Sequence, residues 1–298
     1  MTKHDGTNMN TSNLSYQFKT SSVTIKLIII NLVIFLVVNL VAFFMQIPPV
    51  NLVKWFVLPD AFSDLITQPW AFITYAFIHF SFWHLLFNML WLHWFGTFVL
   101  NLFDGKRFLT VYLLGALFGG LLYVVSYNIF PVFETSKSYL IGASGAVTAI
   151  MVFIATYAPN TEMRIFKWNI KLWKIALFLV LLDLIRLPTG GNAGGMLAHM
   201  GGAIFGYVYG SQLVKGNDIG KWFENFMDWF LNLFKTRKQK PFKKVHRTTT
   251  KATPRSSATT DKTTTQKKVD AILDKIGKSG YESLTKAEKD FLFKAGKD

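Results

Sequence analysis

One serine and one histidine stand out because each is set among small residues inside an apolar part of the chain. Ser144 lies in the string Gly-Ala-Ser-Gly at residues 142–145, and His199 lies in Ala-His-Met-Gly-Gly at residues 198–202. A serine hydroxyl becomes a nucleophile when a neighbouring histidine removes its proton, and the same histidine can later protonate a leaving amine. The two strings are therefore candidates for two parts of one hydrolytic site.

The position of Ser144 in the chain favours this chemistry. The serine comes at the predicted start of an apolar helix, where free backbone N–H groups collect and negative charge is stabilised. An oxyanion on a substrate carbonyl would be stabilised there, and Gly142 and Gly145 leave room for a substrate backbone. The alternative is a role in helix packing alone, because small residues and serines are common where membrane helices touch.

His199 shares one face of its predicted helix with Gly202 and Gly206, which lie at helical spacings from it. Glycines four residues apart allow two helices to approach closely. We therefore expect His199 to lie against a second helix that is rich in small residues, and residues 142–145 form such a patch. The alternative is a histidine that is hydrogen-bonded to a neighbouring carbonyl group.

The acidic residues nearest to the histidine in the predicted layout are Asp183, in the preceding apolar segment, and Asp104. Neither is expected to lie close to His199, and Asp183 has a possible partner, Arg186, three residues further on. The sequence therefore predicts a Ser–His dyad and not a triad.

A third group of polar side chains, His79, His84 and Asn88, belongs to another apolar segment. His84 and Asn88 are four residues apart, share a helix face and can both donate hydrogen bonds, which suits an oxyanion hole. His79 is expected to order the neighbouring loop or to donate as well. A zinc site is the competing interpretation, but no carboxylate lies near in the sequence and the string lacks the acid of the HExxH motif. No metal or other cofactor is predicted.

The composition places these residues in a membrane. Of the 298 residues, 51% are hydrophobic and 16% are charged, whereas soluble domains carry about a quarter charged residues. Apolar runs close to the ~20 residues that span a bilayer recur through the first two thirds of the chain. The absence of cysteine excludes disulfides and thiolate nucleophiles. An all-α polytopic membrane protein, embedded in a lipid bilayer, is predicted.

Six membrane spans are expected between a polar N-terminal segment, residues 1–24, and a C-terminal tail. The predicted spans are about residues 25–45, 72–95, 108–129, 141–158, 172–187 and 194–214, which together form a membrane domain at residues 25–215. Residues 46–70 are rich in proline and aromatic residues and are predicted to lie at the membrane interface.

The charges of the loops predict the orientation of the domain. Residues 104–107 and 159–174 carry net charges of +1 and +3, whereas residues 46–70 and 131–139 carry −1 and 0. By the positive-inside rule, both termini face the cytoplasm, which agrees with an even number of spans. The predicted location is a bacterial inner membrane with both termini inside.

The tail from residue 215 onward holds 20 of the basic residues against 10 acidic residues. Anionic lipid headgroups are its expected partners, and no nucleic acid is expected. Residues 216–236 predict an amphipathic helix that lies on the inner leaflet or packs against the base of the protein. A basic, threonine-rich linker at 237–266 and a small helical hairpin at 267–298 are predicted to follow.

The three strings, in this order and at these depths, resemble the rhomboid family of intramembrane serine proteases over about residues 25–215. The resemblance is carried by HxxxN in the second span, GxSG at the start of the fourth and AHxxGxxxG in the sixth. It implies a six-helix core and a catalytic dyad of Ser144 and His199. It also implies an oxyanion hole made by His84, Asn88 and the Ser144 amide, and substrates that are single-span or polytopic membrane proteins.

Two positions depart from the family pattern. Ala71 follows Trp70 where the family often carries arginine, which would loosen the loop in the outer leaflet. Thr148 stands four residues after Ser144, where an aromatic residue often packs against the histidine. His199 is then either less constrained or covered by another side chain.

Two other functions compete with proteolysis. A non-catalytic binder would recognise unstable membrane segments, and its binding would survive the loss of Ser144. A transporter would need paired charges in its spans or two related halves, but the spans hold only Asp183 and Arg186 and show no repeat. The protease is the first choice and the binder the second.

Overall fold

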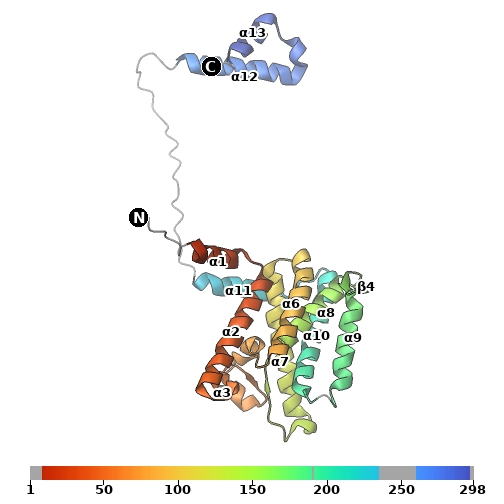
Figure 1. Cartoon of the computed structure of the whole chain (residues 1–298). Coiled ribbons are helices and arrows are strands. Elements are labelled where there is room, and N and C mark those ends of the chain that lie inside the picture. Colours follow the sequence, from red (N-terminus) through yellow and green to blue (C-terminus); the bar gives the residue numbers. More distant parts are fainter. Residues whose placement is uncertain (1–8, 190, 235–259, 296–298) are drawn as a thin grey trace, which may run out of the picture. The chain divides into compact units, whose positions relative to one another are not determined.

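The computed structural model describes residues 9–189, 191–234 and 260–295 (Figure 1). The chain divides into two compact units, Met1–Thr236 and Arg237–Asp298, and each is described by itself. The described residues are mostly helical, with two small two-stranded sheets. The predicted all-α polytopic class is confirmed.

Six long helices build the first unit and correspond to the six predicted spans. They are α2 (Val23–Met45), α6 (Phe82–Leu102), α7 (Gly105–Ile129), α8 (Ser144–Tyr157), α9 (Leu172–Arg186) and α10 (Ala193–Val214). Among the described residues, α2, α6 and α7 are long and apolar enough to cross a membrane, and α8 is a shorter apolar helix. A 14-residue helix such as α8 is about 21 Å long, and it is enclosed by neighbouring helices rather than exposed to lipid.

The helix α8 lies at the centre of the bundle, and most of its residues are buried. Its most extensive contact is with α10, followed by α7 and α6. The α8–α10 crossing is close because glycines of α10 lie against backbone groups of α8, where a β-carbon would overlap them. The pairs are Gly202 with the Gly145 carbonyl, Gly206 with the Ala149 carbonyl and Gly210 with the Phe153 carbonyl.

The second span begins and ends later than predicted. The chain forms the short helices α5 (Ala71–Thr74) and η1 (Tyr75–Phe77), becomes extended at Ile78, and enters α6 only at Phe82. The apolar residues before α6 are buried against protein instead of lipid. Tyr75, for example, is 1% exposed and donates a hydrogen bond to the carbonyl of Ala116 in α7. Hydropathy alone cannot separate these two kinds of burial.

The segment after α2 forms short elements that meet the chain just before α8. It contains α3 (Pro49–Val53), β1 (Leu58–Pro59) and α4 (Phe62–Leu65). The strand β1 pairs antiparallel with β2 (Tyr139–Leu140), with Leu58 opposite Leu140; the 3-10 turn η2 (Pro131–Phe133) lies between α7 and β2. A second hairpin, β3 (Glu162–Ile165) with β4 (Trp168–Lys171), joins α8 to α9.

The described part of the predicted polar N-terminal segment contains one helix, α1 (Met9–Thr20). Its apolar content is low, but Ser21 and Thr20 close its C-terminal end by donating hydrogen bonds to the carbonyls of Gln17 and Tyr16. Ser22 then caps α2 by accepting from the amide of Ile25.

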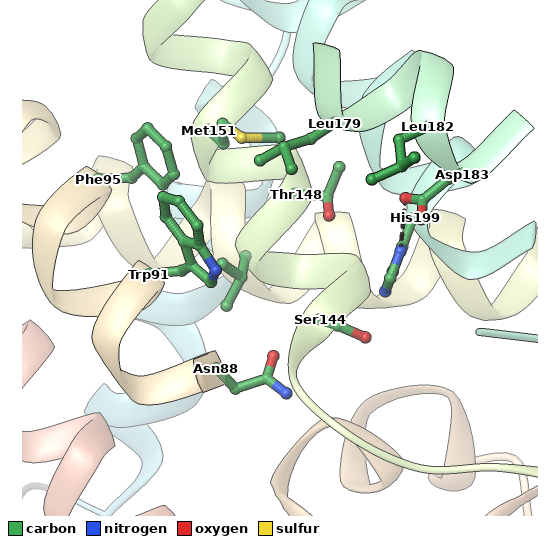
Figure 2. Close-up of a pocket in the computed structure, with 11 residues that line it drawn as sticks. Asn88, Trp91, Phe95, Ser144, Thr148, Met151, Leu179, Leu182, Asp183 and His199 are labelled. Carbon is green, nitrogen blue, oxygen red and sulfur yellow. Dashed lines mark hydrogen bonds and ion pairs between the residues drawn. The ribbon is translucent and has the colours of Figure 1, made fainter. Parts of the chain in front are cut away.

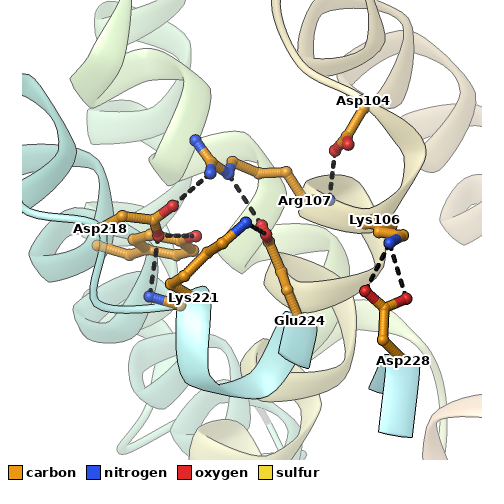
Figure 3. A network of polar contacts seen from close by, with 9 residues as sticks. Asp104, Lys106, Arg107, Asp218, Lys221, Glu224 and Asp228 are labelled. Atoms are coloured by element: carbon orange, nitrogen blue, oxygen red, sulfur yellow. Dashed lines mark hydrogen bonds and ion pairs between the residues drawn. The ribbon is translucent and has the colours of Figure 1, made fainter. Parts of the chain in front are cut away.

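The predicted amphipathic helix is α11 (Lys221–Leu233), and its charged side packs against the base of the bundle (Figure 3). Arg107 at the start of α7 pairs with Glu224 at 3.2 Å and with Asp218. Lys106 pairs with Asp228 at 2.7 Å. The aromatic side of α11 stays exposed: Trp222, Phe226, Trp229 and Phe230. Of the two predicted alternatives, the structure shows packing against the base, and contact of the exposed aromatic face with the inner leaflet stays a prediction.

The second unit contains α12 (Thr260–Ser279), η3 (Tyr281–Ser283) and α13 (Lys286–Ala295). Ile272 and Leu284 are its buried apolar residues. The helix α12 begins inside the segment 237–266 that was predicted to be a linker, because helix propagates outward from the apolar residues that follow. Residues 235–259 of that segment lie outside the described part of the chain.

Candidate active site

Ser144 is the first residue of α8 and faces a cavity between α6, α8, α9 and α10 (Figure 2). The cavity is lined by Asn88, Trp91, Phe95, Ser144, Val147, Thr148, Met151, Leu179, Leu182, Asp183 and His199. A neighbouring pocket shares Asn88, Ser144 and His199, and adds His84 and Asn192 among its lining residues. The serine and the histidine singled out in the sequence therefore lie in one cavity, next to most of the predicted hydrogen-bond donors.

The chain that leads into Ser144 is held by three contacts from the preceding elements. Leu140 pairs with Leu58 across the β1–β2 ladder. The amide of Gly142 donates to the carbonyl of Tyr75 at 2.9 Å, and the amide of Ala143 donates to Nε2 of His79 at 3.2 Å. These bonds fix the backbone on the N-terminal side of the serine, where the first free amides of α8 begin.

Gly142 is required by both conformation and space. Its φ is +104°, a region that residues with a side chain rarely adopt. A β-carbon there would also lie 2.6 Å from Nε2 of His84. The imidazole of His84 thus lies directly against the backbone that leads into Ser144, which is possible only because Gly142 has no side chain.

His199 lies in the second turn of α10, and the close α8–α10 crossing brings it to the start of α8. One helical turn after His199, Gly202 meets the carbonyl of Gly145, the residue that follows Ser144. Figure 2 shows the side chains of Ser144 and His199 directed into the same space, with one ring nitrogen of His199 on the side of Ser144. A serine nucleophile and a histidine base need this kind of arrangement.

The prediction that no acidic residue lies near His199 is wrong. Oδ2 of Asp183, in the last turn of α9, lies 2.7 Å from Nδ1 of His199. No ion pair between Asp183 and Arg186 is found in the described part of the chain. The sequence did carry a signal, since an ionisable residue in a membrane span is a functional candidate. The predicted partner, Arg186, lies on the same helix as Asp183, whereas the observed partner, His199, lies across the α9–α10 turn.

The predicted donors differ in how they reach the cavity. Asn88 lines both pockets, and its side-chain amide donates one hydrogen bond to the carbonyl of His84 at 2.8 Å. The amide carries a second N–H group, which is available to a group bound in the cavity that Asn88 lines. His79 is 1% exposed and is absent from both linings. It acts behind the site, as the acceptor for Ala143.

The two positions that depart from the family pattern occupy different surroundings. Ala71 is fully buried at the start of α5. Thr148 lines the cavity one turn after Ser144, and the side chain bonded to His199 comes instead from Asp183 on α9. Of the two possibilities left open by the sequence, another side chain contacts the histidine.

The chemistry available in this cavity is acyl transfer. A hydroxyl, an imidazole and several N–H donors converge at a helix N-terminus, and apolar side chains complete the walls. Within the described ranges, no three histidine or carboxylate side chains gather as a metal site would need.

Two protein-family models match parts of this chain. Residues 67–216 match the Rhomboid domain family, and residues 259–294 match DUF6576, a family of unknown function. The chain is 30% identical over 155 residues to RHOMBOID-like protein 12, mitochondrial, of Arabidopsis thaliana, which covers 48% of this chain and 46% of that protein. It is 26% identical over 150 residues to Rhomboid protease GlpG of Haemophilus influenzae, covering 50% of this chain and 72% of that protein.

A further relative is Rhomboid protein 1, mitochondrial, of Saccharomyces cerevisiae, with 26% identity over 172 residues, 54% of this chain and 49% of that protein. The chain thus matches less than half the length of these two mitochondrial relatives. The family match covers half of this chain and contains all the residues that line the cavity around Ser144. On this match, the chain belongs to the rhomboid family, and its long apolar helices agree with a membrane protein.

Proposed function

We propose that this protein is an intramembrane serine protease in which Ser144 is the nucleophile and His199 is the general base. The observation that carries the proposal is that both residues line one cavity at the start of α8, with their helices in backbone contact at Gly145 and Gly202. Membership of the rhomboid family and the similarity to Rhomboid protease GlpG of Haemophilus influenzae support it.

The reaction would proceed through an acyl-enzyme. His199 removes the proton from Oγ of Ser144 as that oxygen attacks the carbonyl carbon of a peptide bond. The resulting oxyanion accepts hydrogen bonds from the Ser144 amide and from Asn88 and His84. The imidazolium then returns its proton to the leaving amine, and the carbon–nitrogen bond breaks. Water, deprotonated by His199, hydrolyses the ester and frees the serine.

The surroundings of the cavity suit a membrane-embedded substrate. Trp91 and Phe95 of α6 face Leu179 and Leu182 of α9 across it (Figure 2). These apolar walls suit the side chains of a transmembrane segment of a membrane protein. A substrate backbone that unwinds at this depth must find hydrogen-bond partners in protein or water, and the pocket that contains His84 and Asn192 would supply both.

The orientation stays a proposal as well. The loops at 104–107 and 159–174 carry the excess positive charge, so we place them, and both termini, on the cytoplasmic side. The relatives include mitochondrial and bacterial proteins, and the bacterial inner membrane remains our prediction. Because the chain has no cysteine, one cysteine can be placed at residue 105 in one variant and at residue 135 in another. In intact vesicles, an impermeant maleimide should label only one of these two variants, because we place the two residues on opposite sides of the membrane.

The test is labelling of the detergent-solubilised protein by a fluorophosphonate probe, with a known serine hydrolase labelled alongside. Wild type should label, and Ser144→Ala and His199→Ala should both fail to label while keeping the thermal unfolding temperature of the wild type. A folded wild type that does not label would contradict the protease and favour the non-catalytic binder. Binding of membrane segments that survives Ser144→Ala would distinguish that second function.

A further inference from the structure

From the contact between α9 and α10, we infer that Asp183 is a positioning residue, which orients His199 for base catalysis. The inference rests on the proposed function and adds a third group to it. The carboxylate oxygen lies 2.7 Å from Nδ1, a separation typical of charge-assisted hydrogen bonds. Asp183, His199 and Ser144 line the same cavity in this order across Figure 2.

The bond determines which ring nitrogen is free. A carboxylate can only accept a hydrogen bond, so Nδ1 of His199 must carry the proton and donate to Asp183. The lone pair of a neutral imidazole is then on Nε2, the nitrogen on the side of Ser144. Asp183 therefore selects the tautomer that a general base needs, and its charge stabilises the imidazolium that forms during the attack.

The position of Asp183 argues against a role in surface charge pairing. Its side chain is only 22% exposed, and its partner His199 is 23% exposed. A carboxylate at membrane depth is costly unless it is paired. Arg186, one turn further along α9, is exposed and is not bonded to Asp183 in the described part of the chain. The Asp183 carboxylate therefore stays at the cavity wall, bonded to His199, and does not pair with the nearby Arg186.

The carboxylate bonded to His199 comes from the less tightly packed end of α9. The buried residues of α9 are Leu172, Ile175 and Ala176, all in its first two turns. The last turn, which carries Asp183, is less tightly packed, and α9 lies at the outer edge of the bundle in Figure 1. The Asp183–His199 bond therefore links the loosely packed end of α9 to the catalytic histidine on α10.

The test compares the rate of fluorophosphonate labelling of full-length Asp183→Asn with wild type between pH 5 and 9. A positioned general base contributes about 10²–10⁴-fold to a rate, and we expect Asp183→Asn to lower the plateau rate by at least about tenfold. The acid limb of the profile should move to lower pH, because asparagine no longer stabilises the imidazolium. The groups that face His199 are Asp183 from α9 and His84 from α6, so His84→Gln should be measured as well, to assign the limb to His199.

Two further variants separate positioning from folding. Asp183→Glu keeps a carboxylate and should retain more of the rate than Asp183→Asn, and Arg186→Gln, on the same helix end, should label like wild type. If Asp183→Asn does not fold, Asp183→Ser is measured in its place with the same expectation. An Asp183→Asn rate within twofold of wild type, with an unshifted profile, would overturn the inference and leave the protease intact. A wild type that does not label would overturn the proposed function itself.

Discussion

Gly202 on α10 lies so close to Gly145 on α8 that a β-carbon on Gly202 would overlap the carbonyl oxygen of Gly145. Gly145 directly follows Ser144, and Gly202 comes one turn after His199. This contact therefore determines how near the histidine comes to the serine, because any separation of the two backbones moves the whole first turn of α8 away from α10.

Gly202→Ala should separate these helices and inactivate the protein. Overpacking of a tight interior contact costs about 1–3 kcal/mol, so the thermal unfolding temperature should fall and fluorophosphonate labelling should be lost or strongly reduced. The matched control is Gly277→Ala in α12, where an added β-carbon meets nothing within 4 Å. The Gly277→Ala variant should label normally. Full labelling of Gly202→Ala would show that the Gly202–Gly145 contact does not determine how near His199 comes to Ser144.

Replacing His79 should affect the site through the backbone of Ala143. His79→Leu removes the acceptor of the Ala143 amide, and an unsatisfied buried N–H group costs about 1–3 kcal/mol. Residues 142–144 should then relax, and labelling of Ser144 should slow although His79 does not line the cavity. His79→Gln, which offers a new acceptor, should restore part of the rate; a His79→Leu variant with the wild-type rate would contradict this role. His93→Leu on α6 serves as the control, since it lies outside the cavity of Ser144.

The two cations at the start of α7 should differ in their effect on α11. Arg107 and its partner Glu224 are only 18% and 6% exposed, whereas Lys106 and Asp228 are 52% and 45% exposed. Arg107→Met should leave Glu224 with Lys221 as its remaining cation, destabilising the docked helix by up to about 3 kcal/mol. Lys106→Met should cost less than about 1 kcal/mol. Hydrogen exchange of residues 221–233 measures both variants, and equal protection in the two would contradict the difference.

The helical hairpin of the second unit should show a pH dependence centred on Glu288. Hydrogen bonds from the Thr285 amide, the Lys275 ammonium group and the Thr285 hydroxyl lower the pKa of the Glu288 carboxyl to about 2. A lowered pKa means that the stabilisation is complete above the ordinary pKa of about 4.3 and is lost as the pH falls toward 2. A carbon-13 NMR titration of the carboxyl group, assigned with Glu288→Gln, measures this pKa. A Glu288 carboxyl that titrates at about pH 4.3 would contradict these hydrogen bonds. Thr285→Val, which removes the hydroxyl donor, should raise the pKa of Glu288.

The sequence by itself determined the membrane class, the positions of most helices and the candidate residues for chemistry. Apolar runs of spanning length indicate the positions of most helices. Lipid offers no hydrogen-bond partners to backbone N–H and C=O groups, so an apolar segment in a membrane must form a helix that pairs these groups internally. Ser144 and His199 could be selected because their neighbours are small and because a hydroxyl and an imidazole are costly at membrane depth. The spacing of His199 with Gly202 also predicted the helix face on which they lie.

Only the tertiary structure decided how residues far apart in the chain meet. Asp183 contacts His199 across a turn and at a helix crossing, and His79 accepts from Ala143, which is 64 residues away. The late start of α6 is of the same kind, because residues 72–78 are apolar whether protein or lipid covers them. Helical periodicity reports which face of a helix is apolar, but not which neighbour lies on that face. The neighbours here depend on close backbone contacts between helices, and these form only when the whole bundle is assembled.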